Sequence, residues 1–421
     1  MVAVKRFLSF AERDKGTKEV WIVNHYAVAP DMPGVTRHFS IAKEMVRRDI
    51  RVKIFAADQG NLNPSKPLER KRLSFVTEEK VEGIEFFWLR SKSYSENDWR
   101  RGLNLLSFAV NSFLVNLFRS KPDLIIVSNP QLLAVAAGVL LAKLRGLKVV
   151  VELRDIWPKA LLELSKSRYQ SAAFSLLKIV EKYAYKNAYG FIAASLGIVD
   201  YLSAKRLGDK EILLVPNGVD FDMYKETYGK QEARKRLGLP LGRFIAMYVG
   251  VHGPANSLDT ILDAASMASN DSSLFVLVGD GIEKRRLVSL KEQKGLNNVV
   301  FLGPYPKMQM PKVMECADTL VITLRDVDVF KYGISPNKFF EYMAARKPIV
   351  CSVGGEIGSV VEANRCGVAV RPEDPEELMS AVEFLAANPG IADEMAKNGY
   401  EYVRANNDWS ELAQRVLRYL E

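Results

Sequence analysis

Short apolar runs alternate with segments of helical periodicity along residues 1–216. The runs are apolar at consecutive positions, which is typical of strands that are covered on both faces of a parallel sheet. Residues 37–48, between the first two runs, repeat apolar side chains at the spacing of a helix. This pattern predicts a doubly wound α/β domain. Its predicted strands are residues 20–25, 51–56, 84–89, 123–127, 148–152 and 190–194.

Residues 217–421 repeat this alternation, so the fold class expected is α/β with two domains. The Pro-Asn-Gly turn signal at 216–218 places the boundary near Pro216. Residues 408–421 form an amphipathic segment that can cap either domain. Ligands bind at the carboxyl ends of parallel strands, so a cleft between the domains is the default site. The second set of strands is 243–249, 274–278, 299–302, 319–323, 348–352 and 368–370, with helices at 257–268 and 336–346.

Charge is divided unevenly between the halves. The 421-residue chain has a net charge of +9, but residues 1–216 carry 35 Lys and Arg against 22 Asp and Glu, so the second half is slightly acidic. A basic half suits an anionic partner such as nucleic acid, a phosphorylated substrate or an acidic membrane, and a solvated basic face is the alternative. The three cysteines lack metal spacing, and we find no secretory or membrane-spanning pattern, which favours a cytoplasmic protein.

The segment around residue 338 carries the clearest chemical signal. Ser335 is a favourable N-cap and Pro336 suits the first helical position, so a helix is predicted over 336–346. Lys338 then lies in the first turn, where free N–H groups and the helix dipole attract anions. This predicts a phosphate site, with Glu341 on the same face able to accept from ribose hydroxyls. The alternative is a Lys–Glu surface pair on a helix that packs through its aromatic residues.

Seven motifs are distributed over nearly the whole chain: MPGVTRHFSIAKEM (32–45), ELRDIWP (152–158), LLVPNGVD (213–220), FVLVGDGIEKRRL (275–287), VVFLGPYP (299–306), PNKFFEYMAARKPIV (336–350) and GGEIGSVVE (354–362). Their order and spacing resemble glycosyltransferase family 4, of GT-B fold, particularly the bacterial surface polysaccharide branch with L-fucosamine transferases. The resemblance implies two Rossmann-like domains facing a central cleft. Residues 1–216 would bind the acceptor, residues 217–404 the nucleotide sugar, and a helix at 405–421 would cross back to the first domain.

The resemblance also implies a donor site. Lys338 matches the lysine that contacts the donor diphosphate, and Glu341 matches the glutamate that binds the ribose. Gly34 falls in the loop after the first strand that approaches the diphosphate, and Tyr305 lies in the segment that lines the base. The donor-binding residues expected are Gly34, Gly250, His252, Gly253, Gly279, Tyr305, Ser335, Pro336, Asn337, Lys338 and Glu341.

Three features depart from the family pattern. Gly333 stands where a sugar-reading glutamate is usual, and Val251 and Asn256 stand where the family has an Arg and a Lys. Lys338 is then the only matched cation on the diphosphate. The third departure is Arg154, which precedes Asp155 where the family often has His.

The chemistry implied by the resemblance is a retaining transfer of a hexosyl or N-acetylaminosugar residue from a nucleotide sugar, UDP-linked by expectation, without metal or cofactor. Lys338 would stabilise charge on the leaving diphosphate. Asp155 and Arg154 complete the expected catalytic set near the acceptor hydroxyl. Asp155 as the N-cap of a following segment, or as a partner of Arg154, is the structural alternative. The D-x-D strings at 220–222 and 326–328 are weak metal signals.

Basic and aromatic residues are mixed in residues 88–121 and 159–186. They suit peripheral binding to an anionic membrane and recognition of a lipid diphosphate, so a lipid-linked saccharide or glycan acceptor at the inner face of the plasma membrane is expected. Residues 105–118 are apolar nearly all round, which predicts mainly a core helix, with membrane or acceptor contact in the loop before it. The expected acceptor-binding residues are Arg37, His38, Arg100, Arg101 and Asn104.

Other functions were weighed against this one. A basic stripe with base-reading elements is not recognisable, so nucleic acid is not an expected partner. The departures at Gly333, Val251 and Asn256 leave open a catalytically silent GT-B subunit, and a sugar-nucleotide epimerase shares the fold. His38 and His252 are candidate substrate contacts, with a structural role as the alternative.

Overall fold

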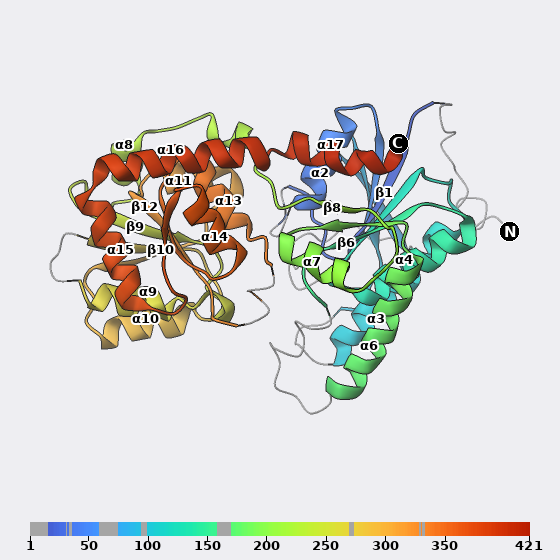
Figure 1. Cartoon of the computed structure of the whole chain (residues 1–421), viewed down its shortest axis with the longest axis horizontal. Coiled ribbons are helices and arrows are strands. Elements are labelled where there is room, and N and C mark those ends of the chain that lie inside the picture. The colour runs from blue at the N-terminus through green and yellow to red at the C-terminus, as the bar shows by residue number, and fades with distance from the viewer. Residues whose placement is uncertain are drawn as a thin grey trace. The chain divides into compact units, whose positions relative to one another are not determined.

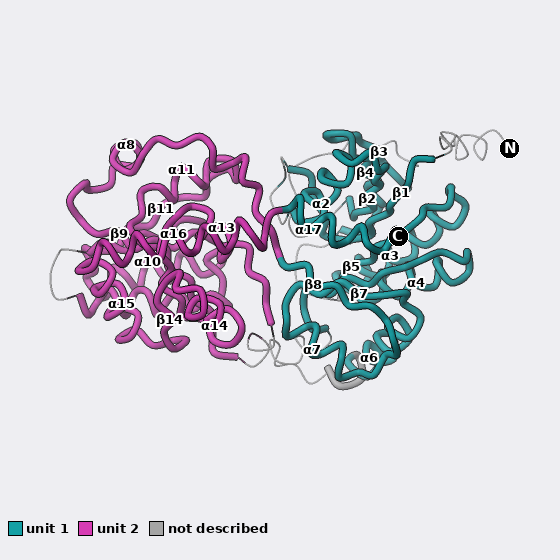
Figure 2. The backbone as a smooth tube through the Cα atoms, turned by 45° about the horizontal axis from the view of Figure 1, so that its top comes forward, with its two compact units in different colours: residues 1–216, 409–421 teal, residues 217–408 magenta. Residues whose placement is uncertain are grey.

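The computed structural model describes residues 16–30, 32, 36–58, 75–93, 99–157, 170–268, 273–327, 330 and 333–421. The chain divides into two compact units, which Figure 2 colours separately. Unit 1 comprises Met1–Pro216 and Trp409–Glu421, and unit 2 comprises Asn217–Asp408. The chain therefore passes from one unit to the other twice.

Unit 1 is built on an eight-stranded sheet of order β3-β4-β2-β1-β5-β6-β7-β8. Every neighbouring pair is parallel except β3 and β4, which form an antiparallel hairpin at one edge. The sheet is twisted and lies between helices (Figure 1). The strands are β1 Glu19–Val23, β2 Arg51–Ala57, β3 Val76–Val81, β4 Ile84–Leu89, β5 Leu124–Ser128, β6 Val149–Leu153, β7 Gly190–Ala193 and β8 Ile212–Leu214.

Helices cover both faces of this sheet because successive strand residues are buried on opposite sides. Trp21 packs into the core on the side of α3, α4, α6 and α7, whereas Ile22 packs on the side of α2 and α17. This two-sided burial confirms the doubly wound architecture. The helices are α2 Arg37–Val46, α3 Trp99–Leu117, α4 Leu132–Arg145, α6 Gln170–Asn187, α7 Leu196–Ala204 and α17 Trp409–Leu417.

Unit 2 has a six-stranded, wholly parallel sheet of order β11-β10-β9-β12-β13-β14. Helices α9, α10 and α15 pack on one face, and α11, α13, α14 and α16 pack on the other. The strands are β9 Phe244–Val249, β10 Ser273–Val278, β11 Val299–Leu302, β12 Thr319–Thr323, β13 Ile349–Ser352 and β14 Gly367–Ala369. The helices are α8 Lys230–Arg236, α9 Asp259–Ser266, α10 Lys284–Gln293, α11 Met310–Met314, α13 Asn337–Ala344, α14 Glu356–Ala363, α15 Pro375–Ala387 and α16 Pro389–Asn406.

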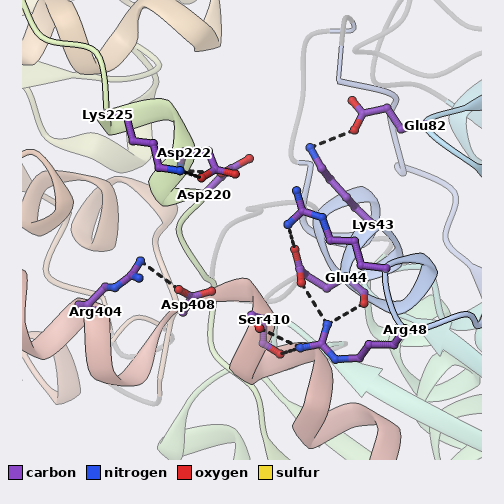
Figure 3. A network of polar contacts seen from close by, with 11 residues as sticks. Lys43, Glu44, Arg48, Glu82, Asp220, Asp222, Lys225, Arg404, Asp408 and Ser410 are labelled. Atoms are coloured by element: carbon purple, nitrogen blue, oxygen red, sulfur yellow. Dashed lines mark hydrogen bonds and ion pairs between the residues drawn. The ribbon is translucent and has the colours of Figure 1, made fainter.

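The C-terminal helix α17 completes the core of unit 1 by packing on α2. Leu412, Ala413 and Val416 are fully buried in the α2 side of that core. A polar contact holds the start of the helix, because Arg48, which follows α2, donates to Ser410 Oγ (2.8 Å) and to Glu44 (Figure 3).

Two strands were missed and one local expectation was wrong. The hairpin strand β3 and the short strand β8 were not predicted. Ser335 does not cap a helix, because α13 begins at Asn337 and the Ser335 hydroxyl accepts instead from the Asn217 backbone N–H (2.8 Å). The segment 105–118, expected to be mainly core, packs one side of α3 into the core and leaves part of its apolar surface exposed.

Candidate functional site

The donor side of the site is centred on Lys338, in the first turn of α13. Its Nζ donates to the Tyr248 hydroxyl (3.0 Å) and to Asn256 Oδ1 (2.5 Å), and it lies 4.6 Å from the centroid of the Tyr248 ring. Tyr248 is in β9, and Asn256 ends the short 3₁₀ turn Pro254–Asn256 that follows it. Among the described residues no carboxylate pairs with Lys338, so its positive charge is available to an anion.

Burial lowers the pKa of Lys338 to about 7. Only a fraction of the molecules therefore carry the charged amine near neutral pH, because its contacts are neutral oxygens that do not offset the loss of water. A diphosphate beside Nζ would favour the charged form and raise this pKa again.

Two strand-end loops form the floor beside Lys338, and they approach each other so closely that glycine is required. Gly279 follows β10 with φ of +138°, and a Cβ there would lie 2.0 Å from the carbonyl oxygen of Gly250. The His252 N–H donates to the carbonyl of Asp280 (2.8 Å), which joins the same two loops. Gly253 is less constrained, because a Cβ there would make only ordinary contacts.

His252 is enclosed by these loops rather than displayed on the surface. Its side chain is buried, and burial lowers its pKa to about 4, so the ring is neutral at physiological pH. The ring faces Tyr248 and Phe301 at centroid distances of about 6 Å. Neither ring nitrogen has a hydrogen-bond partner among the described residues, and the substrate contact of His252 stays a prediction.

The remaining donor candidates surround α13. Glu341 is half-buried, with Lys307 Nζ at 3.7 Å from its carboxylate. Tyr305 is half-buried after β11 and packs against the core. Pro336 is the N-cap residue of α13 and Asn337 its first residue, while Ser335 is held by Asn217. Gly34 lies outside the described residues.

On unit 1, a buried carboxylate organises the carboxyl end of β6. Glu152 accepts from Arg37 Nε (2.8 Å) and pairs with His38 Nε2 (2.7 Å), and all three side chains are almost fully buried. Burial alone would raise the pKa of Glu152, but the charge of Arg37 and the contact with His38 hold it well below its usual value. Burial lowers the pKa of His38, which favours its neutral form.

Arg37 and His38 were expected to bind the acceptor, and both have internal partners. Arg37 also donates to the carbonyls of Val215 (2.7 Å) and Pro216 (2.6 Å), so its guanidinium ties the segment after β8 to β6. The Nδ1 atom of His38 has no hydrogen-bond partner among the described residues. The internal contacts indicate a supporting role for Arg37, and substrate contact by either residue stays a prediction.

The Arg154–Asp155 pair directly follows β6 and is held by one side chain. Asn129 Oδ1 accepts from the Arg154 N–H (2.7 Å), and Asn129 Nδ2 donates to the Asp155 carbonyl (2.6 Å). The Asp155 side chain is exposed and that of Arg154 is partly exposed. This anchoring fixes the backbone of the pair. The segment that Asp155 was considered to cap, after residue 157, lies outside the described residues.

Among the other acceptor candidates, Asn104 is buried and Arg100 and Arg101 are not. Asn104 pairs with His25 Nε2 (2.6 Å) and donates to the Lys92 carbonyl (2.5 Å), which occupies its amide within unit 1. Burial lowers the pKa of His25 to about 4. Arg100 is exposed and Arg101 half-buried in the first turn of α3.

Sequence reasoning missed three residues that support the site: Tyr248, Glu152 and Asn129. Tyr248 reads as an ordinary apolar strand residue, and only the fold brings it to Lys338. Glu152 had a usable signal, because a carboxylate at the end of an apolar strand requires a buried partner. Asn129 follows β5, whose carboxyl end lies next to that of β6, so adjacency in the sheet was needed to find it.

The described part of the chain contains no cluster of three or more His, Cys, Asp or Glu side chains that could hold a metal ion. In the first D-x-D string, Asp220 caps a 3₁₀ turn and Asp222 pairs with Lys225 (2.7 Å, Figure 3). Asp328 of the second string lies outside the described residues. Within the same described ranges, no helix is long and apolar enough to cross a bilayer.

Both halves of the chain match known families. Residues 34–218 match the family described as "Glycosyl transferase 4-like domain", and residues 229–402 match "Glycosyl transferases group 1". Together with the two Rossmann-like sheets, these matches define the protein as a glycosyltransferase of GT-B fold. More particularly, the chain belongs to the group 1, family 4-like glycosyltransferases; its placement in the L-fucosamine transferase branch stays a prediction.

Relatives and solved structures agree with this class. WcaI of Escherichia coli (strain K12), provisionally named a colanic acid biosynthesis glycosyl transferase, is 27% identical over 294 residues, covering 67% of this chain and 71% of WcaI. TuaC of Bacillus subtilis (strain 168), provisionally named a teichuronic acid biosynthesis glycosyltransferase, is 28% identical over 238 residues, covering 55% of this chain and 57% of TuaC.

Two structural neighbours span nearly the whole molecule. Sucrose-phosphate synthase from Thermosynechococcus elongatus has a TM-score of 0.76 at 19% identity and covers 95% of this chain and 98% of its own. Anabaena HepE in complex with UDP has a TM-score of 0.71 at 18% identity and covers 96% of this chain and 99% of its own. At these identities the likeness concerns the fold.

Proposed function

We propose that this glycosyltransferase moves a hexosyl or N-acetylaminosugar residue from a UDP-linked donor to a lipid-linked saccharide or glycan acceptor during synthesis of a cell-envelope polysaccharide. The envelope setting is supported by the relatives named for colanic acid and teichuronic acid synthesis. UDP as the carrier is supported by the structural neighbour that was solved with UDP.

The observation that carries the donor proposal is the environment of Lys338. Its amine lies in the first turn of α13, is held by the neutral oxygens of Tyr248 and Asn256, and has no carboxylate partner among the described residues. Cleavage of the bond between the sugar and a nucleoside diphosphate places negative charge on the β-phosphate. A preorganised cation there stabilises this leaving group, by roughly 3 kcal/mol for a single contact of this type.

Further roles follow from the residues around Lys338 and at the end of β6. Glu341 would bind the ribose, and Asp155 would orient the acceptor hydroxyl, helped by the anchoring of its backbone to Asn129. We propose retention at the anomeric carbon, with the departing diphosphate accepting the acceptor proton, and no metal or other cofactor. These steps need no covalent bond between the sugar and the protein.

A thermal-shift screen against UDP, GDP, dTDP and CMP tests the donor site. A ligand at 100 times its Kd adds about 2.7 kcal/mol of stability, and we expect this for UDP. Lys338→Met, which keeps the side-chain volume but not the charge, should abolish the shift. Lys235→Met, at an exposed lysine of α8, is the control and should keep it. No shift with any nucleotide, or a full shift with the Lys338 variant, contradicts the proposal.

A catalytically silent subunit is the second candidate, because Gly333, Val251 and Asn256 replace polar or charged residues of the family pattern. It predicts nucleotide binding without turnover. Slow hydrolysis of UDP-glucose or UDP-N-acetylglucosamine that Lys338→Met abolishes would favour the enzyme. Conversion of the donor to another sugar nucleotide without any acceptor would indicate an epimerase instead.

A further inference from the structure

Helix α3 exposes an apolar stripe to solvent on the side that faces away from the sheet. Four of its aliphatic residues have exposed side chains, with exposed fractions between 38% and 52%, and they recur at the spacing of one helical face. Phe118, which follows the helix, is 72% exposed. The opposite side of α3 carries Phe108 and Ala109 into the core. The stripe consists of Leu103, Leu106, Val110 and Leu114.

The neighbouring helices also expose aliphatic residues. Helix α4 packs against both α3 and α6, and all three cover the same face of the unit 1 sheet (Figure 1). Leu140 and Leu144 of α4 are exposed, as are Leu176 and Ile179 of α6. Clusters of exposed large aliphatic residues on a soluble protein mark sites of interaction. We call these residues, together with the stripe and Phe118, the α3–α4–α6 surface.

The exposed charge on these helices has a single sign. No acidic residue occurs in α3 or α4, and Glu181, the one acidic residue of α6, is buried and paired with Lys205 (3.0 Å). The exposed charges are basic instead, and Lys178, Lys182 and Lys186 follow one side of α6. Aliphatic residues beside unopposed lysines fit an interface with acyl chains below and anionic headgroups around them.

We propose that the α3–α4–α6 surface docks this protein onto an anionic phospholipid leaflet. A second copy of the chain is a poorer occupant, because two such surfaces face to face would oppose lysine with lysine. The docking rests on the proposed function and deepens it, because an enzyme with a lipid-linked acceptor must reach the bilayer. The docking proposal also changes the sequence expectation, which assigned membrane contact to the loop before α3, because it assigns that contact to α3 itself.

Vesicle co-sedimentation of the full chain tests the docking. We expect binding to vesicles of phosphatidylcholine with about 30% phosphatidylglycerol, little binding to pure phosphatidylcholine, and loss of binding in high salt. Leu106→Ser with Leu114→Ser should weaken binding at least about tenfold. Lys178→Glu with Lys182→Glu should do the same.

Matched controls lie on unit 2, outside the proposed donor site. Leu241→Ser removes an exposed aliphatic residue before β9, and Lys235→Glu with Arg285→Glu reverses two exposed charges. Each change should leave vesicle binding unchanged. Far-UV circular dichroism and the UDP-induced thermal shift are measured on every variant. Weak vesicle binding with an intact UDP shift supports the docking surface.

Several results would overturn the docking proposal. One is equal binding of the wild-type chain to both vesicle types, and another is wild-type binding by the variants of the surface. A wild-type dimer that Leu106→Ser with Leu114→Ser converts to a monomer would also overturn it, because the surface would then be a protein interface. The donor proposal fails separately, because a wild-type chain that binds vesicles but no nucleotide contradicts that proposal alone.

Discussion

Glu152 allows a direct test of how unit 1 is held together. Its carboxylate is 1% exposed and satisfies both Arg37 and His38. Glu152→Gln keeps the shape and one acceptor oxygen, but it removes the negative charge and directs an N–H₂ group at one of two donors. The guanidinium of Arg37 stays buried but loses the charge of its Glu152 partner.

The expected cost follows from this burial. Breaking a buried ion pair by removing one partner destabilises a protein by about 3–5 kcal/mol. For a unit of about 230 residues, each kcal/mol lowers Tm by about 2–4 °C. The variant should therefore unfold about 6–20 °C below the wild type. Glu82→Gln is the control, because its ion pair with Lys43 is partly exposed and contributes about 1 kcal/mol or less.

Tryptophan fluorescence isolates the relevant unit. All five tryptophans lie in unit 1, and residues 217–408 contain none, so tryptophan emission reports the unfolding of unit 1 alone. They are Trp21, Trp88, Trp99, Trp157 and Trp409. Thermal unfolding at pH 7 measures the loss. The reasoning is refuted if Glu152→Gln unfolds within about 2 °C of the wild type while Glu82→Gln behaves as expected.

The pH dependence of the stability of unit 1 provides a second test of Glu152. The pKa of Glu152 is depressed in the folded protein, so its contribution is present above the unfolded value near 4.5 and is lost as pH falls below it. Wild-type unit 1 should lose stability below about pH 4.5, and Glu152→Gln should lose less over the same interval. Equal slopes for the two proteins would count against the assigned ion pair.

Three further predictions concern unit 2 and the C-terminal helix. Because the pKa of Lys338 is about 7, UDP-glucose should bind up to about tenfold more weakly at pH 8 than at pH 6 when Kd is measured by calorimetry. Lys338→Met should remove this pH dependence, and an unchanged wild-type Kd would contradict the assigned role of the amine. Gly279→Ala should lower the UDP-protected Tm, because its Cβ meets the Gly250 carbonyl, whereas Gly253→Ala should not; equal effects would show that the loop contact is unimportant. Leu412→Ala should destabilise the tryptophan-reported transition by about 2–5 kcal/mol, whereas a loss below 1 kcal/mol would mean that α17 is dispensable to unit 1.

The fold was largely predictable because nearly every central strand is buried on both faces and so appears as an uninterrupted apolar run. Strand β3 escaped prediction because it lies at an edge, and its sequence VTEEKV alternates with exposed polar residues. The exposed stripe of α3 escaped prediction because its residues are as apolar as those of the core. Only the packing of α3 shows that Leu106 and Leu114 stay about half exposed.

At the site, local signals sufficed for Lys338 but not for its contacts. Its position in a first helical turn can be inferred from the neighbouring residues, whereas Tyr248 is 90 residues away and meets it only through the sheet. Arg37 shows the same limit. It was expected to bind the acceptor, and the sequence could not show that it pairs with Glu152, which lies 115 residues further along the chain.

The double passage of the chain has a consequence for biosynthesis. Most of unit 1 is made first, yet α17, which closes the α2 side of its core, is made after unit 2. At 5–20 residues per second, the roughly 190 residues of unit 2 delay that closure by about 10–40 s. During this interval the nascent protein displays the apolar sheet face and α2 surface that Trp409, Leu412 and Val416 later cover. Chaperones that bind exposed apolar segments therefore have the most time to bind this surface. A chain released before residue 409 can fold unit 2, but unit 1 lacks the helix that completes its core.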